Sequence, residues 1–296
     1  MSRIQNSGQK ISKTKNNKFL KKLGEIKSTN SYEYWKMLNK KIRDIARPSI
    51  DELEKHFRAL NDVPIDSDKI VAENFVERNY NDSLLNEPIT EDEVVSACKK
   101  LKNNKSPGED RIINEYLKAS IAKMVAHYTT FFNKILNDGI YPEKWSRGLI
   151  IPIYKSKGDR KDPNNYRGIT LLSCVGKLFT SIVNERLKRY CEINNIINEN
   201  QASFRSKYST TDHIFSLKVL VDMFFKGKQK LYCAFVDYKK AIDTVWRDGL
   251  WHKLHQNGIY KTSKVYNIIV NMYDSIKSCV FSANEKTNFF TSNAGV

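Results

Sequence analysis

An aspartate directly follows an apolar run in residues 231–243, LYCAFVDYKKAID. The six apolar or aromatic residues 231–236 predict a strand that is buried on both faces. Asp237 then lies at the carboxyl end of this strand, where ligand crevices open in α/β sheets. Because Lys239 and Lys240 follow it, the carboxylate suits a metal ion that carries a phosphate. The alternative is that Asp237 caps the next helix.

The residues after Asp237 predict that helix, since apolar residues recur at helical spacing at Ala241, Ile242, Val245, Leu250 and Leu254. Asp243, six residues beyond Asp237, is predicted to cap the start of this helix rather than to bind a metal. The sequence around Asp237 therefore offers one carboxylate for metal chemistry.

The charge of the chain indicates a polyanionic partner such as nucleic acid. The 296 residues carry a formal net charge of +17, with a pI near 9.5. The charge is uneven: residues 51–100 hold six basic and thirteen acidic residues, a net of −7, whereas residues 101–296 hold thirty-one basic and seventeen acidic residues, a net of +14. The length allows one large domain or two smaller ones.

No stretch approaches the roughly twenty apolar residues that cross a bilayer, and no signal-peptide core follows Met1. We therefore expect no membrane partner. The five cysteines are odd in number and widely spaced, which predicts reduced core thiols in an intracellular protein of the nucleus or cytoplasm. His252 and His255 are predicted to be surface histidines rather than zinc ligands, because no cysteine or carboxylate pattern joins them.

The first half of the chain divides into two segments. Residues 1–48 are predicted to be a basic, partly flexible linker segment with a short amphipathic helix at 32–42. Residues 49–145 are predicted to be a helical extension, in which 49–52 and 90–93 are capping-box patterns. Within it, residues 61–89 are predicted to be a linker and residues 103–110 a loop. Two helices are expected at 112–122 and 123–137, the second ending at Gly139.

The pattern changes in the third segment, residues 146–296. Residues 148–154 and 166–172 predict two strands of a hairpin whose turn is basic. Ser173 is expected to cap a helix, and further helices are expected at 211–225 and 262–276. Strand-like runs follow at 277–283 and 287–291. Helices that alternate with strands in this way predict an α/β fold, α+β with a mixed sheet.

Five runs in this order resemble the reverse transcriptases of non-LTR (LINE-type) retrotransposons: LKNNKSPGEDRI, GLIIPIYKSKGD, NNYRGITLLSCVGKLF, QASFRSKYSTTDHI and AFVDYKKAID. The closing AGV resembles the opening of the next motif of that family. The resemblance covers roughly residues 90–296. It implies a partial right-hand polymerase fold, with the fingers and the first part of the palm preceded by a helical N-terminal extension.

The resemblance also implies roles for individual residues. Asp237 would be the first of the catalytic aspartates that hold two Mg²⁺ ions, and the backbone at Tyr238 would approach the triphosphate. Lys155 and Arg167 would clamp the phosphates of the incoming deoxynucleoside triphosphate; the alternative is that they are solvated hairpin charges. Ile242 stands where the family has the Phe that excludes the sugar 2′-hydroxyl, so ribonucleotide rejection is expected to weaken.

Three further residues would contact nucleic acid. Phe204 and Arg205 would lie along the RNA template through stacking and phosphate contact. The alternative for this pair is a core phenylalanine beside a surface arginine. Lys105 would contact phosphate from a turn shaped by Pro107 and Gly108, and the DNA primer is the second strand that the resemblance implies.

The sequence departs from the family at three points. Ser203 and Arg111 replace expected glycines, which strains the loops if those positions need a positive φ. Residues 1–296 also contain no adjacent aspartates, although the second catalytic motif of the family is an Asp-Asp pair. We therefore expect a polymerase fragment that does not synthesise DNA by itself. The alternatives are a non-catalytic remnant that binds RNA or DNA, and a fragment that does not fold stably because a sheet edge is unpaired. The sequence does not specify an oligomeric state.

Overall fold

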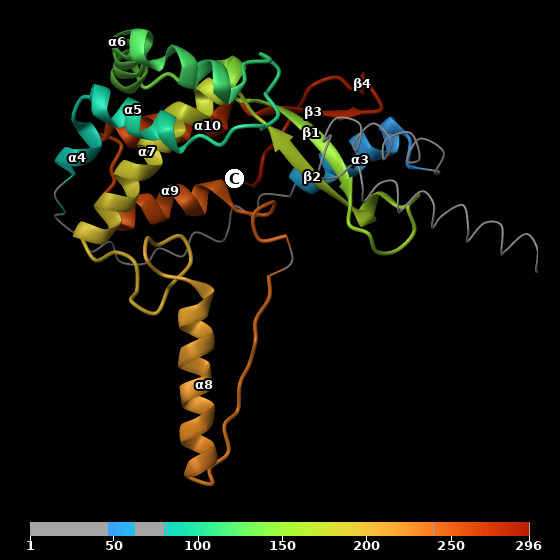
Figure 1. Ribbon diagram of the computed structural model, residues 1–296. Helices are drawn as coiled ribbons and strands as arrows, with labels where there is room; N and C mark the ends of the chain where they lie inside the picture. The colour runs from blue at the N-terminus through green and yellow to red at the C-terminus, as the bar shows by residue number, and fades with distance from the viewer. Residues whose placement is uncertain (1–46, 63–79, 81, 239, 296) are drawn as a thin grey trace, which may run out of the picture. The chain divides into compact units, whose positions relative to one another are not determined.

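The computed structural model describes residues 47–62, 80, 82–238 and 240–295 (Figure 1). The predictions for the basic segment, for the helix at 32–42 and for most of the linker therefore lie outside the described residues. Contacts within the chain define two units. The first comprises residues 1–49 with 156–165, and the second comprises 50–155 with 166–296. The elements discussed below belong to the second unit, except the short helix η3 (Pro163–Asn165).

The second unit contains helices and a mixed sheet. In chain order the elements are α3 (Ile50–Asn61), α4 (Ser83–Asn86), α5 (Glu91–Lys100), α6 (Asn114–Asp138), η2 (Glu143–Trp145), β1 (Arg147–Tyr154), β2 (Tyr166–Leu171), α7 (Cys174–Ile193), α8 (Thr210–Lys226), α9 (Arg247–Gln256), α10 (Lys264–Asp274), β3 (Lys277–Ser282), β4 (Glu285–Lys286) and β5 (Phe290–Thr291). The predicted α/β class with a mixed sheet is confirmed.

The sheet has the strand order β2-β1-β3-β4, and β5 also pairs with β3. Strands β1 and β2 are antiparallel, in a register that runs from Leu149 opposite Leu171 to Tyr154 opposite Tyr166, which confirms the predicted hairpin. Strands β1 and β3 are parallel. Because parallel strands need a crossover, the chain between them forms helices α7 to α10.

Helix α3 covers one face of the hairpin. A side chain at Gly168 would lie 2.9 Å from Cε1 of Phe57, so the glycine leaves the space that this ring fills. The small core formed there consists of Leu53, Phe57, Ile150, Tyr166, Val280 and Phe290. The hairpin therefore has one buried face, and its other face remains available.

A larger core lies among the helices, where α5, α6, α7 and α10 pack together. Local signals set the helix ends as the sequence predicted. Thr90 and Glu93 form a complete capping box at α5, and the Oγ atom of Ser173 accepts a hydrogen bond from the amide of Gly176 at 3.3 Å. Helix α6 ends at Gly139, whose φ is +68°. The expectation of two helices at 112–122 and 123–137 was wrong, because α6 is continuous.

The expected linker at 61–89 was wrong in its last part. Residues 83–86 form helix α4, and the side chains of Leu85 and Ile89 are buried in the large core. Leu85 thus belongs to the folded unit rather than to a connector.

The cysteines and histidines differ from the sequence expectation in detail. All five thiols are free and three are buried, but Cys233 is exposed, so its prediction as a core thiol was wrong. His252 and His255 are partly buried rather than on the surface, and the ring centroid of His255 lies 4.9 Å from that of Tyr266. Within the described part of the chain, no helix is long and apolar enough to cross a membrane.

Candidate nucleotide-binding site

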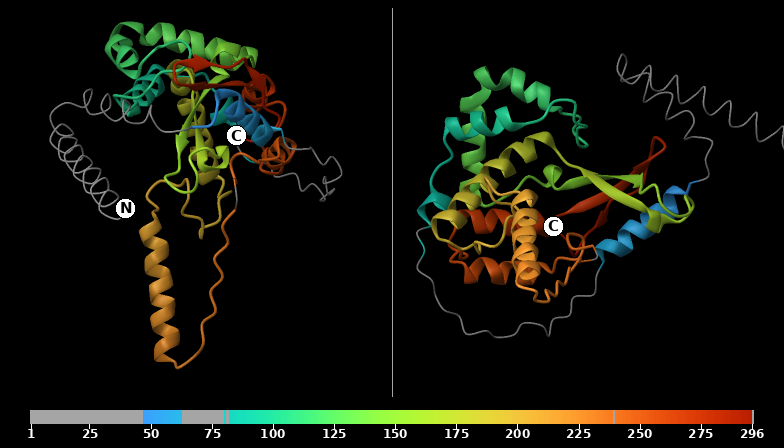
Figure 2. Two further views of the ribbon diagram at one scale, coloured as in Figure 1. Left: turned by 90° about the vertical axis from the view of Figure 1, so that its right-hand side faces the viewer. Right: turned by 60° about the horizontal axis from the view of Figure 1, so that its bottom comes forward.

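The segment that precedes Asp237 is not a strand. Residues 231–238 pair with no described strand, and they run back along α8 as an extended stretch (Figures 1 and 2). The side chain of Phe235 is 84% exposed, and that of Val236 is also exposed. The predicted buried strand was therefore wrong. A strand is buried only when neighbours cover it, and the described residues supply no neighbour here.

Helix α8 shares this exposure. The helix forms where the sequence predicted it, but none of its residues is buried. Its exposed apolar side chains include Ile214, Phe215, Met223 and Phe225. An apolar surface of this extent is unusual for a soluble domain and indicates a surface that takes part in an interaction.

The helix expected directly after Asp237 begins later. Residues 240–244 form a turn in which the amide of Thr244 donates to the carbonyl of Lys240 at 3.1 Å. Helix α9 starts at Arg247, and its N-cap residue is Trp246. The prediction that Asp243 caps the helix was therefore wrong, and this aspartate lies in the turn.

Asp237 is isolated in the structure. Asp237 is exposed and forms no ion pair with any described residue, and Tyr238 and Ile242 are exposed as well. The described residues contain no group of three or more His, Cys, Asp or Glu side chains that could hold a metal ion. The donor set present around Asp237 therefore does not fit a pair of divalent cations, which needs several oxygen ligands.

Arg167 lies on the same face of the hairpin as Ile153, because the two residues are paired across β1 and β2. Lys155 is exposed and directly follows Tyr154, the last residue of β1. The side chain of Arg167 is also exposed and has no hydrogen-bond or ion-pair partner among the described residues.

The same face also presents apolar side chains. Ile153 is 46% exposed, and Ile169, two residues beyond Arg167, is also exposed. This is the face that α3 leaves uncovered. A guanidinium beside two exposed isoleucines is suited to a ligand that combines phosphate with flat apolar rings, because the cation pairs with the phosphate while the aliphatic side chains contact the rings.

Phe204 and Arg205 differ in accessibility. Phe204 is 85% exposed and has a φ of +65°, so the alternative of a core phenylalanine does not hold. The guanidinium of Arg205 binds both carboxylate oxygens of Glu192, at 3.0 and 2.8 Å, and lies 4.3 Å from the ring centroid of Tyr208. The pKa of Glu192 is lowered by its hydrogen bond to this guanidinium. Arg205 therefore has a structural partner in place.

Lys105 is exposed in the predicted loop and has no partner among the described residues. A side chain at Gly108 would lie 2.6 Å from backbone atoms of Leu172 and Ser173, so this glycine lets the loop pack against the start of α7. Arg111, where a glycine was expected, has a φ of +58°, whereas Ser203 is not among the described residues with a positive φ.

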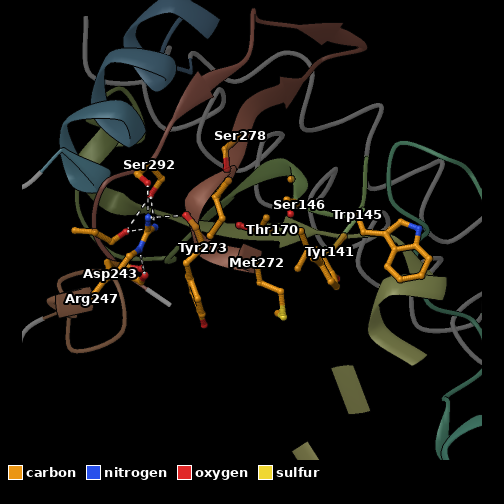
Figure 3. Close-up of a pocket in the computed structure, with 15 residues that line it drawn as sticks. Tyr141, Trp145, Ser146, Thr170, Asp243, Arg247, Met272, Tyr273, Ser278 and Ser292 are labelled. Carbon is orange, nitrogen blue, oxygen red and sulfur yellow. Dashed lines mark hydrogen bonds between the residues drawn. The ribbon is translucent and has the colours of Figure 1, made fainter. Parts of the chain in front are cut away.

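Sequence reasoning missed Arg247. Its guanidinium donates to the carbonyl oxygens of Tyr273, Ser292, Ala294 and Gly295 and also to the Oγ atom of Ser292, at 2.7 to 3.4 Å (Figure 3). Burial lowers the pKa of Arg247. Its acceptors are mostly backbone atoms 26 to 48 residues away, and backbone acceptors leave no trace in side-chain types.

Comparison with known proteins shows what the later part of the chain is similar to. The family model described as reverse transcriptase (RNA-dependent DNA polymerase) matches residues 155–296. The chain is 33% identical over 172 residues to the probable RNA-directed DNA polymerase from transposon BS of Drosophila melanogaster. The aligned region covers 58% of this chain and 19% of that protein.

A second relative is the RNA-directed DNA polymerase from mobile element jockey of Drosophila melanogaster, which is 28% identical over 203 residues. The aligned region covers 69% of this chain and 22% of that protein. A third, the Pol polyprotein from type-1 retrotransposable element R1 of Bradysia coprophila, is 32% identical over 97 residues, covering 32% of this chain and 10% of that protein. The chain thus spans about a fifth of the length of the first two relatives.

Proposed function

We propose that the chain belongs to the reverse transcriptases of non-LTR retrotransposons and supplies part of an RNA-directed DNA polymerase. In this proposal the fingers and the first part of the palm act on an RNA template, a DNA primer and deoxynucleoside triphosphates. The observation that carries the proposal is the match over residues 155–296, which begins at Lys155 and includes both Arg167 and Asp237.

Lys155 and Arg167 are proposed to bind the phosphates of the incoming nucleotide. The exposure of both residues and the position of Arg167 on the hairpin support this role. The pairing of β1 with β2 holds the backbone of Arg167 in place, so that little backbone ordering is needed on binding. Phe204 is proposed to stack on a template base, because its ring is already exposed. Lys105 is proposed to contact a template phosphate.

Asp237 is proposed to be a metal ligand in a longer polymerase, where further carboxylates join it. Mg²⁺ ions would there neutralise the charge that develops on the transferred phosphate. The residues around Asp237 in this structure do not fit a metal pair, and residues 1–296 lack adjacent aspartates. We therefore propose that the chain by itself does not extend a primer.

Tyr238 and Ile242 are proposed to face the nucleotide in the same longer protein. Both side chains are exposed here, so neither packs in the hydrophobic core. Ile242 is a smaller side chain than the phenylalanine expected from the resemblance. We therefore propose that the longer polymerase discriminates weakly against ribonucleotides, which single-nucleotide insertion with deoxy- and ribonucleoside triphosphates measures directly.

Binding of an RNA–DNA hybrid without catalysis is the second candidate function. It is favoured by the isolated Asp237 together with the uncovered face of the hairpin. The net charge of +14 on residues 101–296 supplies the electrostatic attraction.

Two measurements on the purified chain test these candidates. Fluorescence anisotropy reports binding of a labelled RNA–DNA hybrid between about 50 and 200 mM salt, where phosphate contacts weaken steeply. Primer extension on an RNA template with Mg²⁺ reports catalysis. Salt-sensitive binding without extension is the expected result. Extension by the chain alone contradicts the proposed dependence on further residues, and the absence of salt-sensitive binding contradicts both candidates.

A further inference from the structure

A cavity of about 240 Å³ lies at the base of the β1–β2 hairpin (Figure 3). Its walls come from five places: the approach to β1, the end of β2, the region from the end of α10 into β3, the segment at 243–247 and the segment at 292–295. The polar part of the wall includes Ser146, Thr170, Asp243, Arg247 and Ser278. The volume lies below the roughly 300–1,000 Å³ of sites for drug-sized ligands, so the occupant is small.

Gly148 lets two side chains of the cavity wall approach the backbone of β1 closely. A Cβ atom at Gly148 would lie 2.5 Å from Cγ2 of Thr170 and 3.3 Å from the Oγ atom of Ser278. The methyl group of Thr170 therefore fills the place beside this glycine, and the hydroxyl of Ser278 lies next to it. The Ser278 residue is only 7% exposed, and its Oγ atom has no hydrogen-bond partner among the described residues.

Ser146 adds a second hydroxyl without a partner. The residue is 5% exposed, and its Oγ atom is buried without a partner in the described structure. The Oγ atom of Ser278 is not among the fully buried atoms, so this hydroxyl can be reached from the cavity. A hydroxyl that loses water without a replacement destabilises the fold, so the accessible Ser278 hydroxyl favours a ligand that offers hydrogen bonds.

The hydrogen-bonding capacity of the two charged residues in the wall decides which ligands are favoured. Arg247 has five N–H groups, and the structure gives five oxygen acceptors for them, so none is left for an anion. Asp243, the other charged residue of the wall, forms no ion pair with a described residue, so its carboxylate can still accept hydrogen bonds. The wall thus holds one charge of each sign, but it offers acceptors and no free guanidinium donor, which favours a ligand that donates hydrogen bonds over a phosphate or carboxylate.

The rest of the wall is largely aromatic and apolar, with Tyr141, Trp145, Met272 and Tyr273 among its members. We propose that this cavity binds a small planar ring compound that carries an uncharged or cationic N–H donor group. The ring would contact the aromatic side chains, and the donors would meet the Ser278 hydroxyl and the Asp243 carboxylate. This site is independent of the proposed polymerase function, because the cavity offers the phosphates of a nucleoside triphosphate no free guanidinium donor.

Three probes of one shape test the charge preference: benzamidine, benzamide and benzoate. They carry positive, zero and negative charge on the same ring, and isothermal titration of the full chain measures their affinities. We expect benzamidine to bind most tightly, benzamide to bind more weakly, and benzoate not to bind. Benzoate binding at least as tight as that of benzamidine overturns the proposal, as does the absence of saturable binding by benzamidine and benzamide.

Variants then locate the site. Asp243→Asn is expected to weaken the binding of benzamidine about tenfold and to leave the affinity for benzamide unchanged, since only the charged probe loses an ion pair. Ser278→Ala is expected to weaken both probes by a similar factor of about five. Asp222→Asn, an exposed substitution on α8, is the matched control. If Asp243→Asn and Ser278→Ala both bind the probes like the unmodified chain, the ligand lies elsewhere and the proposal is wrong.

Discussion

The guanidinium of Arg186 and the carboxylate of Glu93 form a bidentate ion pair within the helical part of the unit, with both N–O distances at 2.7 Å. Arg186 also donates to the carbonyl oxygens of Glu87 and Pro88. One side chain of α7 thereby holds the start of α5 and the residues before it. Burial acts to raise the pKa of Glu93, but the hydrogen bonds from Arg186 and Thr90 outweigh it and lower the pKa.

Substitution Arg186→Met is expected to destabilise the chain by about 3 kcal/mol. The change leaves the Glu93 carboxylate without its counter-ion and two carbonyl oxygens without donors, and breaking a buried pair from one side typically costs about 3–5 kcal/mol. The lower end applies because the Glu93 side chain keeps 24% of its exposure. Urea unfolding measures the loss.

Arg189→Ala is the matched control, because this arginine is on the same helix but exposed. Its effect is expected to stay within about 0.5 kcal/mol. If both variants lose the same free energy of unfolding, the ion pair of Arg186 with Glu93 contributes no more to stability than an exposed arginine on the same helix.

A second prediction concerns His255, whose Nε2 atom is buried without a partner. Burial lowers its pKa, and the positive charges of Lys261 and His252 lower it further. The folded state thus binds this proton less readily than the unfolded state, so stability is expected to fall as the pH drops below about 6.5. His255→Phe keeps a ring against Tyr266 and removes the titration. Thermal melts of this variant are expected to change less between pH 7 and pH 5 than those of the unmodified chain; an equal change in both would rule out His255 as a source.

The elements that the sequence predicted well are those with local causes. The cap at Thr90, the stop at Gly139 and the two strands of the hairpin depend on residues within a few positions of one another. The position of Arg167 opposite Ile153 follows from the hairpin register in the same way. Local chemistry therefore fixes where Arg167 lies in β2, whereas the phosphate contacts of Lys155 and Arg167 stay predictions.

The surroundings of Asp237 depend on partners that are distant in the sequence. The apolar run before Asp237 indicates that burial of this segment would be favourable. It does not indicate which element would cover the segment, and no described element covers it. The same holds for the apolar side chains of α8. The sequence did not predict the partly buried position of Arg247, because a charged residue is expected at the surface. Backbone carbonyls from segments distant in the sequence make its burial possible.

Arg111 provides a third prediction, because its φ of +58° is a conformation that glycine adopts without strain. Arg111→Gly is expected to raise the free energy of unfolding, by up to about 1 kcal/mol. Ser203→Gly is the matched comparison, since its backbone needs no positive φ. That variant is expected to lower stability by a few tenths to about 1 kcal/mol, because glycine has more freedom to lose on folding. Chemical denaturation of both proteins measures the two signs, and a loss in both would show that position 111 is not strained.

Arg167 and Arg205 give the sharpest test of the candidate site, because both were predicted to contact phosphates but only Arg167 is without a partner. Arg167→Ala is expected to weaken binding of an RNA–DNA hybrid about fivefold and to reduce the slope of log affinity against log salt by about one. Arg205 is already paired with Glu192 and is only 10% exposed. Arg205→Ala is therefore expected to lower the melting temperature while leaving the salt slope unchanged. Anisotropy titrations at several salt concentrations, with a thermal melt of each variant, distinguish the two. If Arg205→Ala reduces the slope as much as Arg167→Ala does, the ion pair with Glu192 opens on binding, and the template contact predicted from the sequence is restored.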